Sequence, residues 1–142
     1  MVAIIDSGFW FALFDKKDSY NKYTNGILKK LDECVDKIII PWPSLYEVLN
    51  EFFLQRNLDA WKFFFEKNVK KGKFVLEDDK LYQDDALLTV FDEKKCSLVD
   101  AIINQMIEKN QKIDILVTFN ARDFFDIARK HNVEIIDQNF SN

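Results

Sequence analysis

The sequence predicts an α/β fold, a three-layer α/β/α sandwich in which a parallel β-sheet lies between two layers of helices. Short apolar runs recur along the chain, and each is followed by segments with apolar residues at helical spacing. This alternation is typical of parallel strands connected by helices. The runs are apolar throughout, as expected for strands covered on both faces. With 142 residues, 48% of them hydrophobic, the chain is expected to form a single domain over 1–142.

The first part of the chain contains the first two strands of this sheet. The run "VAII" (2–5) predicts a strand, followed by a short helix over 7–14 and a longer one over 19–36. The run "KIII" (37–40) predicts the second strand, which Pro41 ends. The apolar stripe of the longer helix consists of Tyr20, Tyr23, Ile27, Leu31 and Val35.

The middle of the chain continues with a helical pair and the third strand. Two helices are predicted over 44–56 and 58–71, and Gly72 is expected to end the second of them. The run "KFVLE" (73–77) predicts the third strand, and a helix near 80–93 follows it. The helices would cover the sheet before the chain returns to it.

The last part of the chain completes a five-stranded sheet. An amphipathic helix over 97–110 precedes the strand "DILVT" (114–118), and a helix over about 123–131 precedes the fifth strand, "VEII" (133–136). Ligands of such open sheets bind beyond the carboxyl ends of the strands, near the point where the strand order reverses. We therefore expect a functional site at that edge.

The scarcity of histidine and cysteine limits the chemistry that the chain can perform. The single histidine, His131, rules out multi-histidine metal sites and Ser-His-Asp catalysis, although a Cys-His pair stays open. Cys34 and Cys96 match no zinc-binding pattern, and we expect inert thiols in a reducing compartment such as the cytoplasm. Carboxylates are then the main candidates for catalysis.

Charge and hydropathy limit the classes of partner that the chain is expected to bind. No apolar run approaches the roughly 18 residues of a membrane span, and the start lacks the pattern of a signal peptide, so no membrane association is expected. The net charge of −4 argues against binding nucleic acid by bulk charge alone. It remains compatible with a nuclease whose carboxylates are offset by bound divalent ions.

Four acidic residues stand next to predicted strands or at predicted helix starts. Asp6 follows the first strand, Asp123 lies just past the fourth, and Glu47 and Asp100 lie near the starts of two helices. Each has a purely structural explanation. Asp6 is a suitable helix N-cap. The other three stand three residues after a potential N-cap, in the pairs Ser44 and Glu47, Ser97 and Asp100, and Asn120 and Asp123.

A functional interpretation follows from where such helices begin. Helices that follow parallel strands begin at one edge of the sheet, so acids at their starts would point into one region. Carboxylates that lie close together repel and raise one another's pKa unless a cation lies among them. Mg²⁺ and Mn²⁺ prefer carboxylate oxygens, and such a site suits hydrolysis of phosphodiester bonds. Spacing alone leaves open whether the four acids meet.

Four segments in order resemble the PIN-domain nucleases, and in particular the VapC-type toxins of toxin–antitoxin pairs. The segments are "IIDSGFWFALFDKKD", "IPWPSLYEVL", "CSLVDAII" and "LVTFNARDF". The resemblance runs over nearly the whole chain and implies a PIN-like fold with a five-stranded parallel sheet. It also implies an endoribonuclease that uses Mg²⁺ or Mn²⁺ to cleave RNA. Its implied protein partners are a second copy in a homodimer and a small antitoxin that blocks the site.

The resemblance also implies roles for individual residues. The acidic set, which would bind the metal and carry out catalysis, is Asp6, Glu47, Asp100 and Asp123. Ser7, Thr118 and Asn120 would be polar support around it. Many relatives carry an acid where Asn120 stands, so whether Asn120 or Asp123 fills the fourth position stays open. The loop "DKKDSYNK" (15–22) departs as well, because relatives often carry His where this chain has Tyr20 and Asn21.

Other interpretations compete with the nuclease. The run "VLEDD" (75–79) resembles the opening of a receiver domain, but the later strands of that fold are missing in the right order, so we interpret Glu77, Asp78 and Asp79 as a solvated loop and helix cap. The run "IIDSG" (4–8) would suit a haloacid dehalogenase-type phosphatase only with an Asp in place of Gly8. Lys16, Lys17 and Arg122 could steer RNA, although ordinary solvated charge is the simpler interpretation.

The aromatic segments leave a second class of function open. The runs "GFWFALF" (8–14) and "AWKFFF" (60–65) place rings on nearly every face of two helices. Burial in the core is the ordinary explanation. The alternative is an exposed groove for a partner helix or a second subunit, which would make the chain a PIN-like binding module with little or no catalysis.

Overall fold

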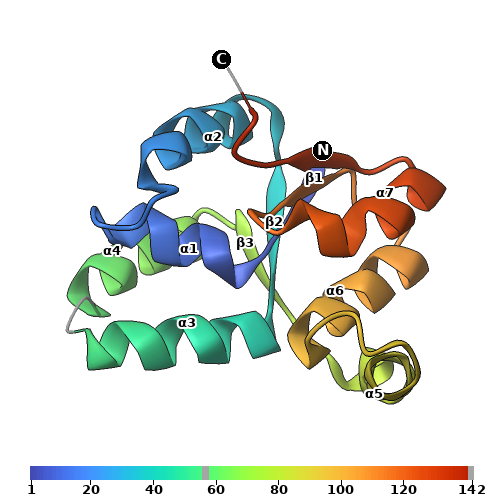
Figure 1. The fold of residues 1–142 in the computed structure, drawn as a ribbon. Coiled ribbons are helices and arrows are strands. Elements are labelled where there is room, and N and C mark those ends of the chain that lie inside the picture. Colours follow the sequence, from blue (N-terminus) through green and yellow to red (C-terminus); the bar gives the residue numbers. More distant parts are fainter. Residues whose placement is uncertain (56–57, 141–142) are drawn as a thin grey trace.

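The computed structural model describes residues 1–55 and 58–140, and it confirms the predicted α/β/α sandwich (Figure 1). All five strands pair in parallel in one sheet, in the order β3-β2-β1-β4-β5. The strands are β1 (Val2–Ile5), β2 (Lys37–Pro41), β3 (Phe74–Glu77), β4 (Ile115–Val117) and β5 (Glu134–Ile136).

The order of the strands places the topological switch point between β1 and β4. The central strand is β1. Strands β2 and β3 lie on one side of it, and strands β4 and β5, which come later in the chain, lie on the other. Ile5 pairs with Val117, and the backbone N–H of Asp6 donates to the carbonyl of Val117 at 3.0 Å. The carboxyl ends of β1 and β4 therefore lie side by side, where an open sheet of this kind binds its ligands.

Helices cover both faces of the sheet, with four in one layer and three in the other (Figure 1). The first layer consists of α1 (Ser7–Phe14), α2 (Asn21–Cys34), α3 (Trp42–Leu54) and α4 (Leu58–Lys70). The second consists of α5 (Gln83–Glu93), α6 (Leu98–Lys109) and α7 (Phe125–His131), with the 3-10 turns η1 (Lys80–Tyr82) and η2 (Ala121–Phe124). In β1, Ala3 and Ile5 pack in the first layer and Ile4 in the second, which is the alternation of a doubly covered strand. Among the described helices, none combines the length and apolarity needed to cross a membrane.

The aromatic segments supply the core of the first layer. The ring of Trp10 makes edge-on contacts with the rings of Trp61 at 5.0 Å and Phe74 at 5.6 Å. Such pairs contribute about 0.5–1.5 kcal/mol each beyond the area that they bury. Core burial therefore explains the Trp residues, whereas Phe63 on the outer face of α4 remains 75% exposed.

Element boundaries differ from the predictions where proline or local turns decide them. Helix α3 begins at Trp42, with Pro41 in the N-cap position and Pro43 in the first turn, so the predicted cap at Ser44 is wrong. Proline is favoured in the first turn because its missing N–H would have no helical partner there. The predicted end of this helix at Arg56 lies outside the described residues. The helices predicted near 80–93 and 123–131 each open with a 3-10 turn, η1 and η2.

Ser44 gives a direct test of this boundary. Its side chain is fully buried, and its hydroxyl finds no hydrogen-bond partner within residues 1–55 and 58–140. We expect Ser44→Ala to leave the free energy of unfolding unchanged or to raise it slightly, because the hydroxyl gains nothing from burial. Ser97 is the matched control, because its hydroxyl accepts from the backbone N–H of Asp100 at 3.2 Å as a true N-cap. Ser97→Ala should cost about 0.5–2 kcal/mol in urea denaturation. Equal losses in the two variants would contradict this boundary.

Candidate functional site

Asp6 is the centre of the polar cluster at the carboxyl edge of the sheet. Its side chain is only 7% exposed, directly between the end of β1 and the start of α1. One carboxylate oxygen, Oδ1, accepts from the backbone N–H of Ser7 at 2.8 Å, which confirms Asp6 as the N-cap of α1. The other, Oδ2, accepts from the hydroxyl of Thr118 at 3.0 Å, just past the end of β4. Both strands at the switch point thus fix the orientation of this carboxylate.

The environment of Asp6 acts on its pKa in both directions. Burial is the largest influence and raises the pKa of the carboxyl group. The hydrogen bonds from Thr118 and Ser7 lower it, and the negative charge of Asp123 raises it again. The net effect is a pKa above the ordinary value for Asp. A nearby positive charge would stabilise the ionised form of a carboxylate held in this way.

Asp100 and Asp123 lie together at the same edge. Burial is the largest of the influences that raise the pKa of Asp100 to about 7, and the charge of Asp6 adds to it. A hydrogen bond between the carboxyl groups of Asp100 and Asp123 raises it further, because the protonated form can donate. The start of α6 and the turn η2 therefore bring together two acids that are distant in sequence. Asp100 therefore keeps its proton to a higher pH than an ordinary aspartate.

Asn120 supports Asp123 instead of capping a helix. Its side-chain amide donates to Oδ2 of Asp123 at 2.6 Å, and its backbone N–H donates to the Thr118 hydroxyl at 3.0 Å. Asn120 stands in the N-cap position of η2 but makes no capping hydrogen bond through its side chain, so the predicted cap is wrong. The side chain instead points its amide N–H groups at the carboxylate of Asp123, a charged acceptor, and its oxygen accepts no backbone N–H of η2.

Glu47 approaches the cluster from α3. The side chain as a whole is exposed, yet partial burial of its carboxyl group raises its pKa above the ordinary value for Glu. A hydrogen bond from Ser7 lowers this pKa, and the charge of Asp6 raises it. Ser7 therefore lies between two acids, because its hydroxyl also lies 3.5 Å from Oδ1 of Asp6. All four predicted acids are thus coupled electrostatically at this edge, where α1, α3 and α6 begin (Figure 1).

The donor set fits a hard divalent cation by its chemistry. It contains carboxylates alone, the ligands that Mg²⁺ and Mn²⁺ prefer. Burial, and after it the charge of neighbouring carboxylates, raises the pKa values of Asp6, Glu47 and Asp100. Across the described residues, however, no three His, Cys, Asp or Glu side chains stand in an arrangement that could hold one metal ion. The carboxylates converge without forming a complete ligand shell.

Asn104 is a member of the cluster that sequence reasoning missed. Its side-chain amide donates to the carbonyl of Asp100 at 2.9 Å and lies 3.5 Å from the carbonyl of Asp123. It therefore links α6 to η2 and helps to hold the two acids together. Its place one helical turn after Asp100 was the signal that could have identified it.

Neither cysteine forms a catalytic pair. Burial and the charges of Asp100, Asp123 and Glu93 raise the pKa of Cys96, which keeps its thiol protonated and unreactive. The thiol of Cys34 bonds to the carbonyl of Lys30 at 2.9 Å. The ring of His131 bonds to Glu108 at 2.6 Å. Cys-His chemistry is therefore not supported by the contacts of these side chains.

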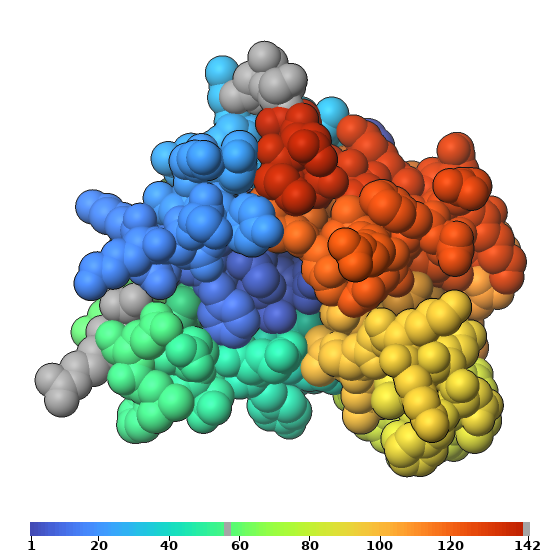
Figure 2. Space-filling view, viewed as in Figure 1, coloured from blue at the N-terminus to red at the C-terminus, as the bar shows by residue number. Residues whose placement is uncertain are grey.

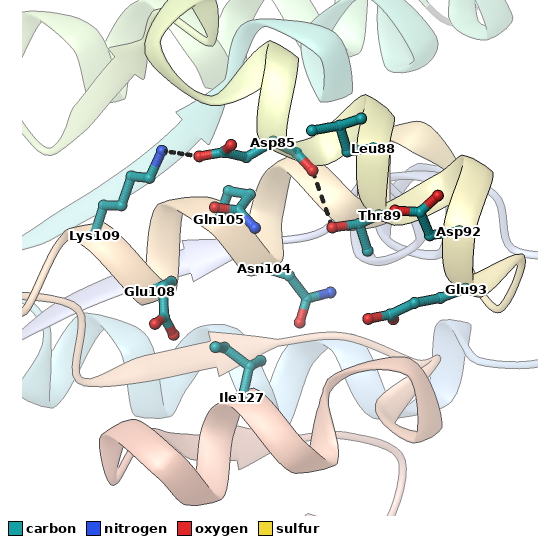
Figure 3. A pocket seen from close by; sticks show the side chains of 10 residues that line it. All are labelled: Asp85, Leu88, Thr89, Asp92, Glu93, Asn104, Gln105, Glu108, Lys109 and Ile127. Carbon is teal, nitrogen blue, oxygen red and sulfur yellow. Dashed lines mark hydrogen bonds and ion pairs between the residues drawn. The ribbon is translucent and has the colours of Figure 1, made fainter.

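Two hollows adjoin the cluster on the side of α5. The first, of about 530 Å³, is lined by Cys96, Asn104, Arg122 and Asp123 among others. The second, of about 520 Å³, lies between α5 and α6 (Figure 3). Its charged lining consists of Asp85, Asp92, Glu93, Glu108 and Lys109. The single lysine is bound to Asp85 at 2.7 Å, so this hollow is strongly acidic.

Comparisons with known proteins identify the fold. No protein-family model matches the sequence, and no curated protein matches it either. Among solved structures, the VapC20 toxin of Mycobacterium tuberculosis, described as cleaving the sarcin–ricin loop, matches with a TM-score of 0.61 and 18% identity over 85% of this chain and 92% of that one. A toxin–antitoxin complex from Klebsiella pneumoniae contains a chain that matches with a TM-score of 0.61 and 17% identity over 96% of this chain and 97% of that one. The chain therefore has the fold of VapC toxins, as the resemblance in its sequence predicts.

Proposed function

We propose that this protein is a Mg²⁺- or Mn²⁺-dependent endoribonuclease that acts as the toxin of a toxin–antitoxin pair. The observation that carries the proposal is the convergence of Asp6, Glu47, Asp100 and Asp123 at the switch point of the sheet. The fold shared with the VapC20 toxin supports it, because that toxin is described as cleaving RNA of the sarcin–ricin loop. Free thiols in the described residues agree with action in the cytoplasm.

In this proposal the four carboxylates divide the work. Asp6, Glu47 and Asp100 would hold the cation, directly or through water, and Asp123 would complete the site or orient the attacking water. A bound divalent cation would supply activation of water and neutralisation of charge at the scissile phosphate. Ser7 and Thr118 orient Asp6 through the hydrogen bonds described above, as outer partners commonly orient ligands.

In this proposal the Asp100–Asp123 pair is the group that binds and releases a proton. The pKa of Asp100 of about 7 means that the pair carries a proton much of the time at neutral pH. A cation competes with that proton for the same oxygens, so cation binding should release a proton and strengthen as the pH rises.

Exposed apolar side chains supply surfaces for protein partners. They include Tyr46 and Phe53 on α3, Phe63 on α4, and Leu88 and Phe91 on α5. Patches of this kind are typical of protein contacts in soluble proteins. An antitoxin and a second copy of the chain are the partners proposed for them, and the chain from Klebsiella pneumoniae is described as part of a toxin–antitoxin complex.

Asp123 and Asn120 can be ranked by mutation. We expect Asp123→Asn to weaken Mn²⁺ binding by more than about 100-fold, because it removes a charged oxygen from the site. Asn120→Ala should weaken it by only about 10-fold, because it removes a partner of the ligand and leaves the carboxylate in place. Isothermal titration calorimetry of the two variants at one pH gives the order, and the reverse order would assign the working position to Asn120.

Digestion of RNA distinguishes the nuclease from a binding module. Purified protein is incubated with total RNA in Mn²⁺ or Mg²⁺, with and without a chelator, and new RNA ends are mapped. The nuclease should produce cuts at defined positions that disappear with the chelator. RNA that is bound but stays intact under every metal condition would favour the alternative, a PIN-like binding module without catalysis.

A further inference from the structure

A column of three aromatic rings runs from the core to the surface beside the acidic cluster. The ring of Phe9, fully buried on α1, lies 6.1 Å from the ring of Phe119. The ring of Tyr20 then stacks on Phe119 at 4.7 Å with an interplanar angle of only 14°. Tyr20 is the outer member, and 36% of its surface is exposed.

The middle ring of the column is joined to the site through its neighbours in sequence. Phe119 stands between Thr118, which donates to Asp6, and Asn120, which donates to Asp123. Its backbone therefore cannot move without disturbing both ends of the carboxylate cluster. Tyr20 lies one ring beyond Phe119, on the side away from Phe9 and the core.

The backbone at Tyr20 is held firmly before any ligand arrives. Its N–H donates to the carboxylate of Asp18 at 2.8 Å, which fixes the turn before α2. The side chain of the next residue, Asn21, donates to the carbonyl of Ala12 at 2.7 Å and so anchors the turn to the end of α1. A ring held in this way loses little conformational entropy when a ligand binds.

Charge favours a polyanion over the 15–22 turn rather than over the hollow between α5 and α6. The turn before α2 exposes Lys16, Lys17 and Lys22, against two aspartates in the same stretch, 15–22. The hollow between α5 and α6 has four carboxylates and one lysine (Figure 3). In Figure 2 the first helix lies at the centre of the face, between the 15–35 segment and the segment around 115–130. A backbone of phosphates leaving the cluster meets less repulsion over the 15–22 turn.

We propose that the outer face of Tyr20 is a stacking platform for one unpaired base of the RNA substrate, beside the bond that is cut. The proposal rests on the proposed nuclease function. Stacking on aromatic rings is the usual way in which proteins hold unpaired RNA bases, and it tolerates different bases because each has a π-face. The lysines of the turn would contact the neighbouring phosphates. The apolar surfaces of α3 to α5 are left for protein partners.

Kinetics on a single-stranded oligoribonucleotide that the wild-type protein cleaves test the platform. Tyr20→Leu keeps an apolar cover over Phe119 but has no ring, and we expect its KM to rise about 5- to 100-fold. Its kcat should change far less, because the carboxylates are untouched. Tyr20→Phe should restore the wild-type KM. Leu81→Ala, which shortens an exposed apolar side chain of η1, is the control that should leave both constants unchanged.

Abasic substitution of the RNA gives a readout that does not depend on folding of a variant. Bases near the cut are removed one at a time. At one position, removal of the base should raise the KM of the wild-type protein by the same factor as Tyr20→Leu does on intact RNA. On that abasic RNA the KM of Tyr20→Leu should rise little further, because both changes remove the same contact. Cleavage by the wild type with an unchanged KM in Tyr20→Leu, or additive losses, would overturn the platform alone. Absence of RNA cleavage by the wild type would overturn the nuclease, and the platform with it.

Discussion

Asp6→Asn is expected to reduce metal-dependent RNA cleavage by at least about 100-fold, the cost of removing one group that stabilises charge at a reacting centre. The variant should fold normally. An asparagine has the same shape, its oxygen can still accept from Ser7, and the Thr118 hydroxyl can rotate to accept from the new amide. Burial raises the pKa of Asp6, so loss of its charge should leave the free energy of unfolding unchanged or increase it. Activity and stability would then move in opposite directions, as is common at functional sites.

The matched control is Asp59→Asn, which removes the charge of an exposed acid on α4, another helix of the first layer. It should leave both cleavage and stability close to wild type, because its carboxylate takes no part in the cluster. Cleavage is followed with a defined oligoribonucleotide, and stability by urea denaturation of the same preparations. Full activity in Asp6→Asn would remove this residue, and the metal site built around it, from the mechanism.

Without metal, the protein should lose stability as the pH rises from 5 to 8, and Asp100 should account for most of the loss. The folded state raises the pKa of Asp100 from 3.8 to about 7, so it binds the proton more tightly than the unfolded chain. The stabilisation is complete below about pH 4 and disappears as the pH rises through about 7. The full effect would be about 4 kcal/mol at about 1.4 kcal/mol for each pKa unit. Because the side chain is partly exposed, screening reduces the expected difference to about 1–2 kcal/mol.

Urea denaturation of wild type and Asp100→Asn between pH 5 and pH 8, in a chelator, isolates this contribution. Other titrating groups are common to both proteins, so the difference between the two curves belongs to Asp100. The curve of Asp100→Asn should be flatter. Asp123→Asn removes the charge of Asp123 and changes its hydrogen bond but leaves the burial of Asp100 and the charge of Asp6, so it should give an intermediate slope. Parallel curves for wild type and Asp100→Asn would mean that Asp100 titrates in the folded protein as it does in the unfolded chain.

The strands and their order of appearance were predictable because both faces of the sheet are buried. A run such as "ILV" (115–117) has no polar residue to place on a solvent face, so the run itself marks the strand. Helix starts were less certain, because two local rules competed at 41–44. The capping rule favoured Ser44, whereas the tolerance of the first turn for proline allowed the helix to begin at Trp42.

The site was predictable at the level of which edge would be used, and less so in its contacts. Asp6 as a cap follows from its place directly after a strand, which is a local relation. The pairing of Asp100 with Asp123 depends on how α6 packs against η2, and no local pattern carries that information. The side chain of Asn120 could accept from a backbone N–H as a cap or donate to Asp123, and only the folded positions decided for Asp123. The role of Tyr20 likewise arises from a stack with a ring 99 positions later in the chain.

Titration of Mn²⁺ into the protein, followed by electron paramagnetic resonance and by proton release, tests the carboxylate site most directly. Wild type should bind Mn²⁺ below millimolar concentration and release up to one proton per ion near pH 7, because the ion displaces the proton of Asp100. Asp6→Asn should lose the binding, and Asp59→Asn should keep it. Absence of Mn²⁺ binding by the wild type at millimolar concentration would contradict the metal site and favour a binding module built on the same fold.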